Sequence, residues 1–192
     1  MEMNQLNIEQ RKNIYEEHLV KDFHKDEVKS HERIETLISH DKYMCFGFFE
    51  QNQQMGYAYF AKESKGESYL LDYLVVFKEY RSQGVGSLCL DLIKKKLKEE
   101  GKLLLAEVEN PSFASTMEEE AMRKKRVHFY QKNGFKISKI LSRIYNDNYQ
   151  IIYFTWKDRL TDQVAMEKLW KLYQTIFEDK FIKNNVCVEL SE

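Results

Sequence analysis

The sequence predicts an α+β fold in three layers, with helices on both faces of a mixed central sheet of about six to seven strands. Short apolar segments alternate with amphipathic helical segments along most of the chain. Two of the apolar segments are separated by a helical one, which is the pattern of a strand–helix–strand crossover between parallel strands. Hydrophobic residues make up 43% of the chain and proline occurs once, which favours one folded core over linkers.

The first part of the chain is predicted to form two helices and a hairpin. Residues 6–20 and 26–39 carry apolar side chains at helical spacing. Residues 43–49 and 54–61 have the composition of strands and flank the polar segment 50–53, which is typical of a turn. We expect this hairpin to start the sheet.

The middle of the chain is predicted to form the crossover. Residues 70–77 are almost continuously apolar, which indicates a central strand buried on both faces. Residues 85–99 place their apolar side chains on one stripe of a helix, and residues 102–109 are expected to form the next strand.

The last part of the chain is predicted to contain two strands between two helices. Strands are expected near 136–145 and 149–156. Residues 117–132 and 162–182 have helical spacing, and the second of these segments forms a wide apolar stripe that could bury against the sheet or against a second copy of the chain.

Length, charge and cysteine content limit the class of protein. A chain of this length is expected to form a single domain over residues 1–192. The formal net charge of −1 argues against a nucleic-acid partner, and no apolar run approaches the length of a membrane span. The N-terminus lacks the apolar region of a signal peptide, and the three cysteines show neither disulfide nor zinc spacing. These features predict a cytoplasmic protein without a metal site.

The strongest candidate for a binding site is the turn between the central strand and the helix that follows it. Amide groups at a helix N-terminus have no partner inside the helix, and the helix dipole adds positive charge there. Glycine allows a close approach of an anion to the backbone. The turn therefore predicts a phosphate site formed by Arg81, Ser82, Gln83, Gly84, Val85, Gly86 and Ser87. A turn that only required small residues is the alternative.

A second motif lies downstream, after the strand 102–109, and the two motifs together resemble those of the GNAT superfamily of acetyl-CoA-dependent N-acetyltransferases. The first motif is [QR]-x-x-G-x-[GA] and the second is F-Y-x-x-x-G-F. They are matched by Arg81, Gly84 and Gly86, and by Phe129, Tyr130, Gly134 and Phe135. The resemblance covers about residues 43–156 and implies the GNAT fold, acetyl-CoA as co-substrate and a primary amine, on a small molecule or a protein, as acceptor.

The resemblance also implies roles for particular residues. The amides of residues 82–87 would bind the pyrophosphate of the cofactor. The backbone of Leu74, Val75 and Val76 would pair with its pantetheine arm as an added strand does. Tyr130 would be the general acid that protonates the leaving sulfur, the alternative being a tyrosine that only packs in the core.

The general base is less defined by the sequence. Glu107 lies in an A-E-V segment similar to the one that carries the base in some relatives, and Glu109 points to the same side of the strand. Asp72, on the central strand, is a third candidate, and a water chain without a dedicated base is a fourth possibility. The resemblance places the acceptor near Phe23 and His24, with Asp72 and Glu109 as further substrate-binding candidates.

The chain departs from the resembled pattern before Tyr130. Many relatives have an asparagine and an alanine where this chain has Arg123 and Arg126, and residues 111–122 have the appearance of an insertion. The basic run 123–126 is expected to form a solvated helix face. The alternative for Arg123 and Arg126 is a contact with a phosphate of the cofactor. An alternative function of a different class is a CoA-binding sensor or interaction module without turnover, against which the presence of Tyr130 argues.

Overall fold

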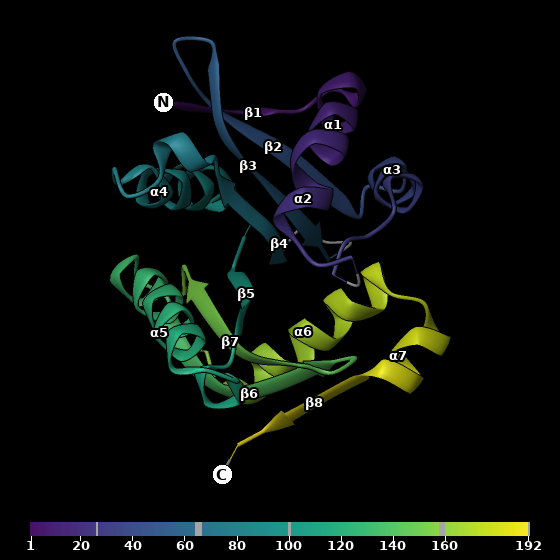
Figure 1. Ribbon diagram of the computed structural model, residues 1–192. Coiled ribbons are helices and arrows are strands. Elements are labelled where there is room, and N and C mark those ends of the chain that lie inside the picture. The colour runs from purple at the N-terminus through teal and green to yellow at the C-terminus, as the bar shows by residue number, and fades with distance from the viewer. Residues whose placement is uncertain (26, 64–66, 100, 158–159, 192) are drawn as a thin grey trace.

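The computed structural model describes residues 1–25, 27–63, 67–99, 101–157 and 160–191. A mixed sheet of eight strands lies between two layers of helices (Figure 1). The three-layer α+β prediction is therefore confirmed, with one or two strands more than expected. Among the described residues, no helix combines the length and the apolar composition needed to cross a bilayer.

The elements follow one another in this order: β1 Glu2–Gln5, α1 Ile8–Ile14, η1 Tyr15–Leu19, α2 Val20–Asp22, α3 His31–Ser39, β2 Tyr43–Glu50, β3 Gln53–Lys62, β4 Ser68–Val76, η2 Lys78–Tyr80, α4 Val85–Leu97, β5 Leu103–Glu109, η3 Pro111–Phe113, α5 Met117–Lys132, β6 Lys136–Ile144, β7 Asp147–Thr155, α6 Asp162–Ile176, α7 Asp179–Asn185 and β8 Val186–Leu190.

The strand order across the sheet is β1-β2-β3-β4-β5-β7-β6-β8. All neighbours are antiparallel except β4 and β5, which are connected by the crossover through α4. This parallel pair is short, because its register runs only from Ser68 opposite Leu103 to Leu71 opposite Ala106. Beyond these residues the two strands are no longer paired.

Each face of the sheet has its own apolar core. On one face, α1, α3 and α6 cover side chains such as Tyr57 and Leu105, and on the other face α4 and α5 cover side chains such as Phe60 and Leu104 (Figure 1). Alternate residues of β5 thus enter opposite cores, as the period of a strand requires. The sheet is buried on both sides at its centre, in agreement with the apolar sequence of 70–77.

Side-chain caps begin most of the longer helices. Asn7 and Gln10 form a capping box at α1, and Thr116 and Thr161 accept the N3 amides of α5 and α6. Ser30 caps α3, so this helix starts at His31 and not at residue 26 as predicted. The exceptions are α4 and α7, for which no side-chain cap is found.

Two predicted helices are wrong in part. The segment 6–20 contains a π-helical turn, η1, before the short α2. The last helix was expected to continue through 182, but Phe177 adopts an extended conformation (φ −110°, ψ 155°) and separates α6 from α7. The chain then turns back as β8 along β6, a strand the sequence did not predict because its side chains are mostly exposed.

Candidate active site

The divergence of β4 and β5 opens one edge of the central strand. On its other side β4 stays paired with β3 up to Val76, which lies opposite Gly56. A Cβ atom at Gly56 would lie 2.2 Å from the carbonyl oxygen of Val75, so this pairing is closer than any other residue allows. Residues 72–76 therefore keep their strand conformation while the edge toward β5 is free to pair with an extended ligand.

The predicted phosphate turn lies at the end of this open edge. Gly84 is the N-cap of α4, with φ +82°, and offers no side-chain hydrogen bond to the first amides of the helix. Ser82 also has a positive φ of 62°. The Arg81 side chain turns back, and its Nε donates to the carbonyl of Val76 at 2.8 Å. The first turn of α4 thus has no side-chain cap beside the strand, although the amide of Ser87 already donates to the carbonyl of Gly84 at 3.0 Å.

A cavity of about 1420 Å³ runs along the open edge and connects the turn with the interior. The site residues predicted from the sequence that line it are Phe23, His24, Asp72, Leu74, Val75, Val76, Arg81, Ser82, Gly84, Gly86, Ser87, Glu107, Glu109 and Tyr130. Two of the predicted site residues, Gln83 and Val85, are not part of the cavity lining. Gln83 is exposed and its Nε2 donates to the carbonyl of Glu79, and Val85 is buried in the core under α4.

Tyr130 projects from α5 into the wall of the cavity. It is 8% exposed, and its ring stands at steep angles to those of Phe129 and Phe135, with centroids 5.2 Å away in both cases. Burial raises the pKa of Tyr130 to about 12, against a smaller opposing effect of Arg126. The hydroxyl therefore keeps its proton at neutral pH and is available as a donor.

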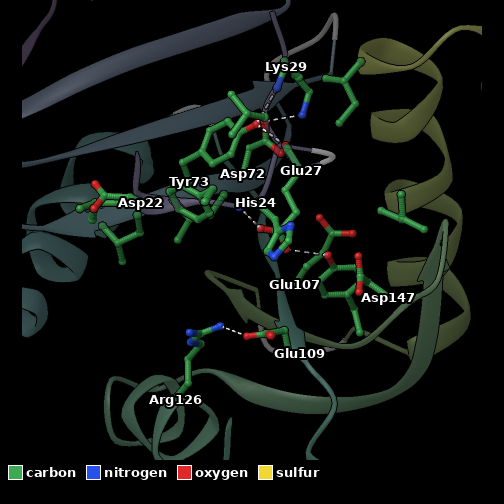
Figure 2. Close-up of a pocket in the computed structure, with 18 of the residues that line it drawn as sticks. Asp22, His24, Glu27, Lys29, Asp72, Tyr73, Glu107, Glu109, Arg126 and Asp147 are labelled. Atoms are coloured by element: carbon green, nitrogen blue, oxygen red, sulfur yellow. Dashed lines mark hydrogen bonds and ion pairs between the residues drawn. The ribbon is translucent and has the colours of Figure 1, made fainter. Parts of the chain in front are cut away.

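Glu107 projects from β5 at the point where β5 separates from β4. Removal from water raises the pKa of Glu107 to about 7, although the hydroxyl of Tyr173 donates to its Oε1 and favours the charged form. Figure 2 shows the Glu107 carboxylate in the same space as those of Glu27 and Asp147. A carboxyl group that titrates near neutrality inside a cavity is suited to accept a proton.

Asp72 is engaged by other groups of the cavity wall. Its Oδ2 binds Lys29 Nζ at 2.7 Å and accepts a hydrogen bond from Tyr43. The Lys29 ammonium group lies 5.4 Å from the ring centroid of Tyr73 and 5.3 Å from that of Phe177. The cavity therefore already contains one ammonium group between a carboxylate and aromatic rings, which is the chemistry that recognises cations.

Glu109 is held by the two arginines that depart from the resembled pattern. Arg126 forms an ion pair with Glu109, and Arg123 Nη2 lies 3.5 Å from Glu109 Oε1 (Figure 2 draws the Arg126 pair). Arg123 Nη1 also donates to the carbonyl of Asn110 at 2.9 Å. The expectation of a solvated basic face is thus wrong for Arg123, whose side chain is 14% exposed and links α5 to the end of β5.

Several residues of the site carry no local signal in the sequence. The sequence places Tyr173 only within the apolar stripe of residues 162–182, and it reaches Glu107 because α6 packs on the face of the sheet to which Leu105 of β5 also points. Glu27 accepts a hydrogen bond from Tyr149 at 3.2 Å, which joins the loop before α3 to β7. Such contacts depend on how distant elements pack, so periodicity and motifs do not reveal them.

Known proteins share this architecture. A family model described as an acetyltransferase (GNAT) domain matches residues 41–137. A putative GNAT-family acetyltransferase from Bacteroides thetaiotaomicron is 18% identical with a TM-score of 0.73, over 91% of this chain and 97% of that chain. The Escherichia coli ribosomal-protein-S18-alanine N-acetyltransferase is 18% identical with a TM-score of 0.58, over 82% of this chain and 95% of that chain. None of the curated proteins compared with this chain matched it.

A further similar structure contains a bound ligand. It is an aminoglycoside 6'-N-acetyltransferase complexed with coenzyme A, 15% identical with a TM-score of 0.59, over 83% of this chain and 99% of that chain. At these identities the structures establish the fold alone. The family model covers just over half of the 192 residues, so the chain belongs to the GNAT acetyltransferase family.

Proposed function

We propose that the protein is an N-acetyltransferase that transfers the acetyl group of acetyl-CoA directly to a primary amine in a ternary complex. The observation that carries the proposal is one continuous cavity that joins a free helix N-terminus, an open strand edge, a protonated tyrosine and a carboxyl group with a pKa near neutrality. A site that only bound CoA would need the first two features but not the last two.

The cofactor end of the site is supported by the donors available there. The uncapped first turn of α4 offers amide groups to a pyrophosphate, and the open edge of β4 offers backbone groups to the pantetheine arm. Gly86 adds a steric requirement, since a Cβ atom there would lie 3.2 Å from the Phe129 ring. The cavity exceeds the roughly 300–1,000 Å³ of ordinary ligand pockets, as binding a large cofactor together with an acceptor requires.

The chemistry divides between the two sides of the cavity. Acetyl-CoA supplies a thioester, whose carbonyl carbon is attacked by the amine nitrogen. Glu107 accepts the proton that the amine loses as the C–N bond forms, and Tyr130 donates its proton to sulfur as the C–S bond breaks. The products are the amide and the CoA thiol. Glu107 then releases its proton to solvent and Tyr130 regains one from solvent, so protons and bonds balance without a metal or a covalent enzyme intermediate.

The direct test measures binding and turnover separately. Calorimetry with purified protein should detect acetyl-CoA, and bound acetyl-CoA should raise Tm because it binds only the folded state. A panel of small amines and N-terminal peptides should then be assayed for CoA release. Gly86→Leu, which obstructs the turn, should lose the Tm shift while keeping the fold.

Each outcome has a distinct meaning. Absence of acetyl-CoA binding at millimolar concentration contradicts the proposal as a whole. Binding without CoA release for any amine of the panel favours the alternative of a sensor module on the same fold. Gly84→Ala is a useful comparison for Gly86→Leu, because a Cβ atom at Gly84 meets no atom within 4 Å and strains only the backbone.

A further inference from the structure

We propose that Tyr173, with Ser142 behind it, is a positioning residue that fixes the orientation of Glu107 and increases the fraction of Glu107 that is ionised. The contact itself is independent of the reaction, whereas its catalytic consequence rests on the proposed role of Glu107 as base. The proposal assigns a function in the site to α6, which lies outside the residues 41–137 that the family model matches.

Two hydrogen bonds join Glu107, Tyr173 and Ser142 in that order. The Tyr173 hydroxyl donates to Glu107 Oε1, and its oxygen lies 2.8 Å from Ser142 Oγ. Tyr173 and Ser142 are buried, at 0% and 3% exposure, on α6 and β6. Three separate elements thus determine where the Glu107 carboxylate points.

The direction of the bonds follows from counting protons. Tyr173 has one hydroxyl proton, which goes to Glu107, so Ser142 must donate to the tyrosine oxygen. Burial raises the pKa of Tyr173 well above its ordinary value, so Tyr173 stays a donor throughout the working pH range. A donor that is itself hydrogen-bonded by a second hydroxyl is polarised and binds an anion more strongly.

The other groups that face Glu107 do not fix its position. Asp72 on β4 and Glu27 in the loop before α3 raise the pKa of Glu107 by like-charge repulsion, and Lys29 lowers it through space. Tyr149 on β7 is close enough to feel the charge of Glu107, but its hydroxyl bonds to Glu27. Among these neighbours, the side-chain hydrogen bond to Glu107 comes from Tyr173, and it opposes the effect of burial.

Direct titration of Glu107 tests the proposal without substrate. The carboxyl carbon resonance of Glu107 can be assigned in ¹³C-glutamate-labelled protein as the signal that Glu107→Gln lacks. Tyr173→Phe keeps the ring and deletes the donor, so the midpoint of the Glu107 titration should rise by roughly 1 to 2 pH units. Ser142→Ala should raise it by a smaller amount. The pKa that describes the acid limb of the kcat/KM profile should rise by the same amount.

Tyr59→Phe is the matched control. Its hydroxyl is also buried in the same core, but it has no hydrogen-bond partner among the described residues, so the Glu107 midpoint should not move. An unchanged or lowered midpoint in a folded Tyr173→Phe protein overturns the proposal, and Ser142→Ala decides in the same way if that variant does not fold. A raised midpoint with an unmoved kcat/KM profile supports the positioning contact and contradicts Glu107 as the base.

Discussion

Burial acts on Tyr130 and Glu107 in the same direction but with opposite chemical results. For both groups the charged form is disfavoured, so both pKa values rise. For Tyr130 the rise secures a proton that was already present at neutral pH. For Glu107 it brings the midpoint of titration to the pH at which the protein is expected to work. A donor and an acceptor are thus obtained from the same physical effect, acting at two places in the cavity wall.

Tyr130→Phe should separate catalysis from binding. The ring and its packing against Phe129 and Phe135 remain, so Tm and acetyl-CoA affinity should be close to those of the wild type. Loss of the proton donor should lower kcat roughly 10²–10⁴-fold, with little change in KM for acetyl-CoA. Stopped-flow measurement of the chemical step provides the readout. A wild-type rate in a stable variant would show that Tyr130 is a packing residue.

Glu107 should make stability depend on pH in a defined direction. Its pKa is about 7 in the folded protein and 4.5 in the unfolded chain, so the folded state binds the proton more tightly. Its contribution to the free energy of unfolding is fully present below pH 4.5 and is lost as the pH rises through 7. Relative to Glu107→Gln, wild-type stability should therefore fall by up to about 3 kcal/mol between about pH 4.5 and 8.

Urea unfolding of both proteins across this pH range measures the difference. The comparison cancels the titration of every other group that the two proteins share. A constant difference between them would show that Glu107 titrates near its ordinary pKa and is not poised as a base.

At the scale of elements, local signals predicted the strand, turn and helix at which we propose that the cofactor binds. The apolar run of β4, the glycines of the turn and the stripe of α4 each reflect local backbone and packing requirements. The break at Phe177 and the strand β8 were not predicted, because the apolar spacing continues across the break and β8 is defined by its pairing with β6. The contacts of Glu27 and Tyr173 near Glu107 were not predicted either, because they also depend on how distant elements pack.

The β3–β4 pair should be sensitive to any side chain at Gly56. The nearest obstacle is the backbone oxygen of Val75 at 2.2 Å, which cannot rotate away as a side chain does. Gly56→Ala should cost about 1–3 kcal/mol of stability and weaken acetyl-CoA binding by displacing the edge of β4. Denaturant unfolding and calorimetry give the two values. If Gly56→Ala is destabilised but binds acetyl-CoA with wild-type affinity, cofactor binding does not depend on the exact position of β4.

At the scale of the whole molecule, the net charge of −1 conceals an uneven distribution. Glu27, Asp147 and Glu178 line the cavity and form no salt bridge with any residue in the described ranges. Clefts with charge of one sign concentrate ligands of the opposite sign. Although Lys29 and Arg33 also line the cavity, the three carboxylates without an ion pair lead us to propose an acceptor that carries positive charge in addition to the reacting amine.

Raising the salt concentration should weaken the binding of a diamine acceptor more than the binding of a monoamine. Raising the ionic strength from about 0.05 to 0.5 M shortens the range of charge interactions, so KM for a diamine should increase several-fold. KM for a monoamine of similar length should change less. Steady-state kinetics at several sodium chloride concentrations give both values. Equal salt effects on both amines would show that the unpaired carboxylates do not act on the acceptor.

The late position of Tyr173 in the sequence has a consequence for the order in which the protein is completed on the ribosome. Folding during synthesis proceeds from the N-terminal side. By the time residues 41–137 have emerged, the glycine turn, β4 and Tyr130 are present, but β7 and the helix that carries Tyr173 have not emerged. β7 is the partner of β5 on the side away from β4, and α6 contributes Leu169, Leu172 and Tyr173 to the core on one face of the sheet. The walls of the cavity are therefore completed only after the residues that follow 137 have emerged.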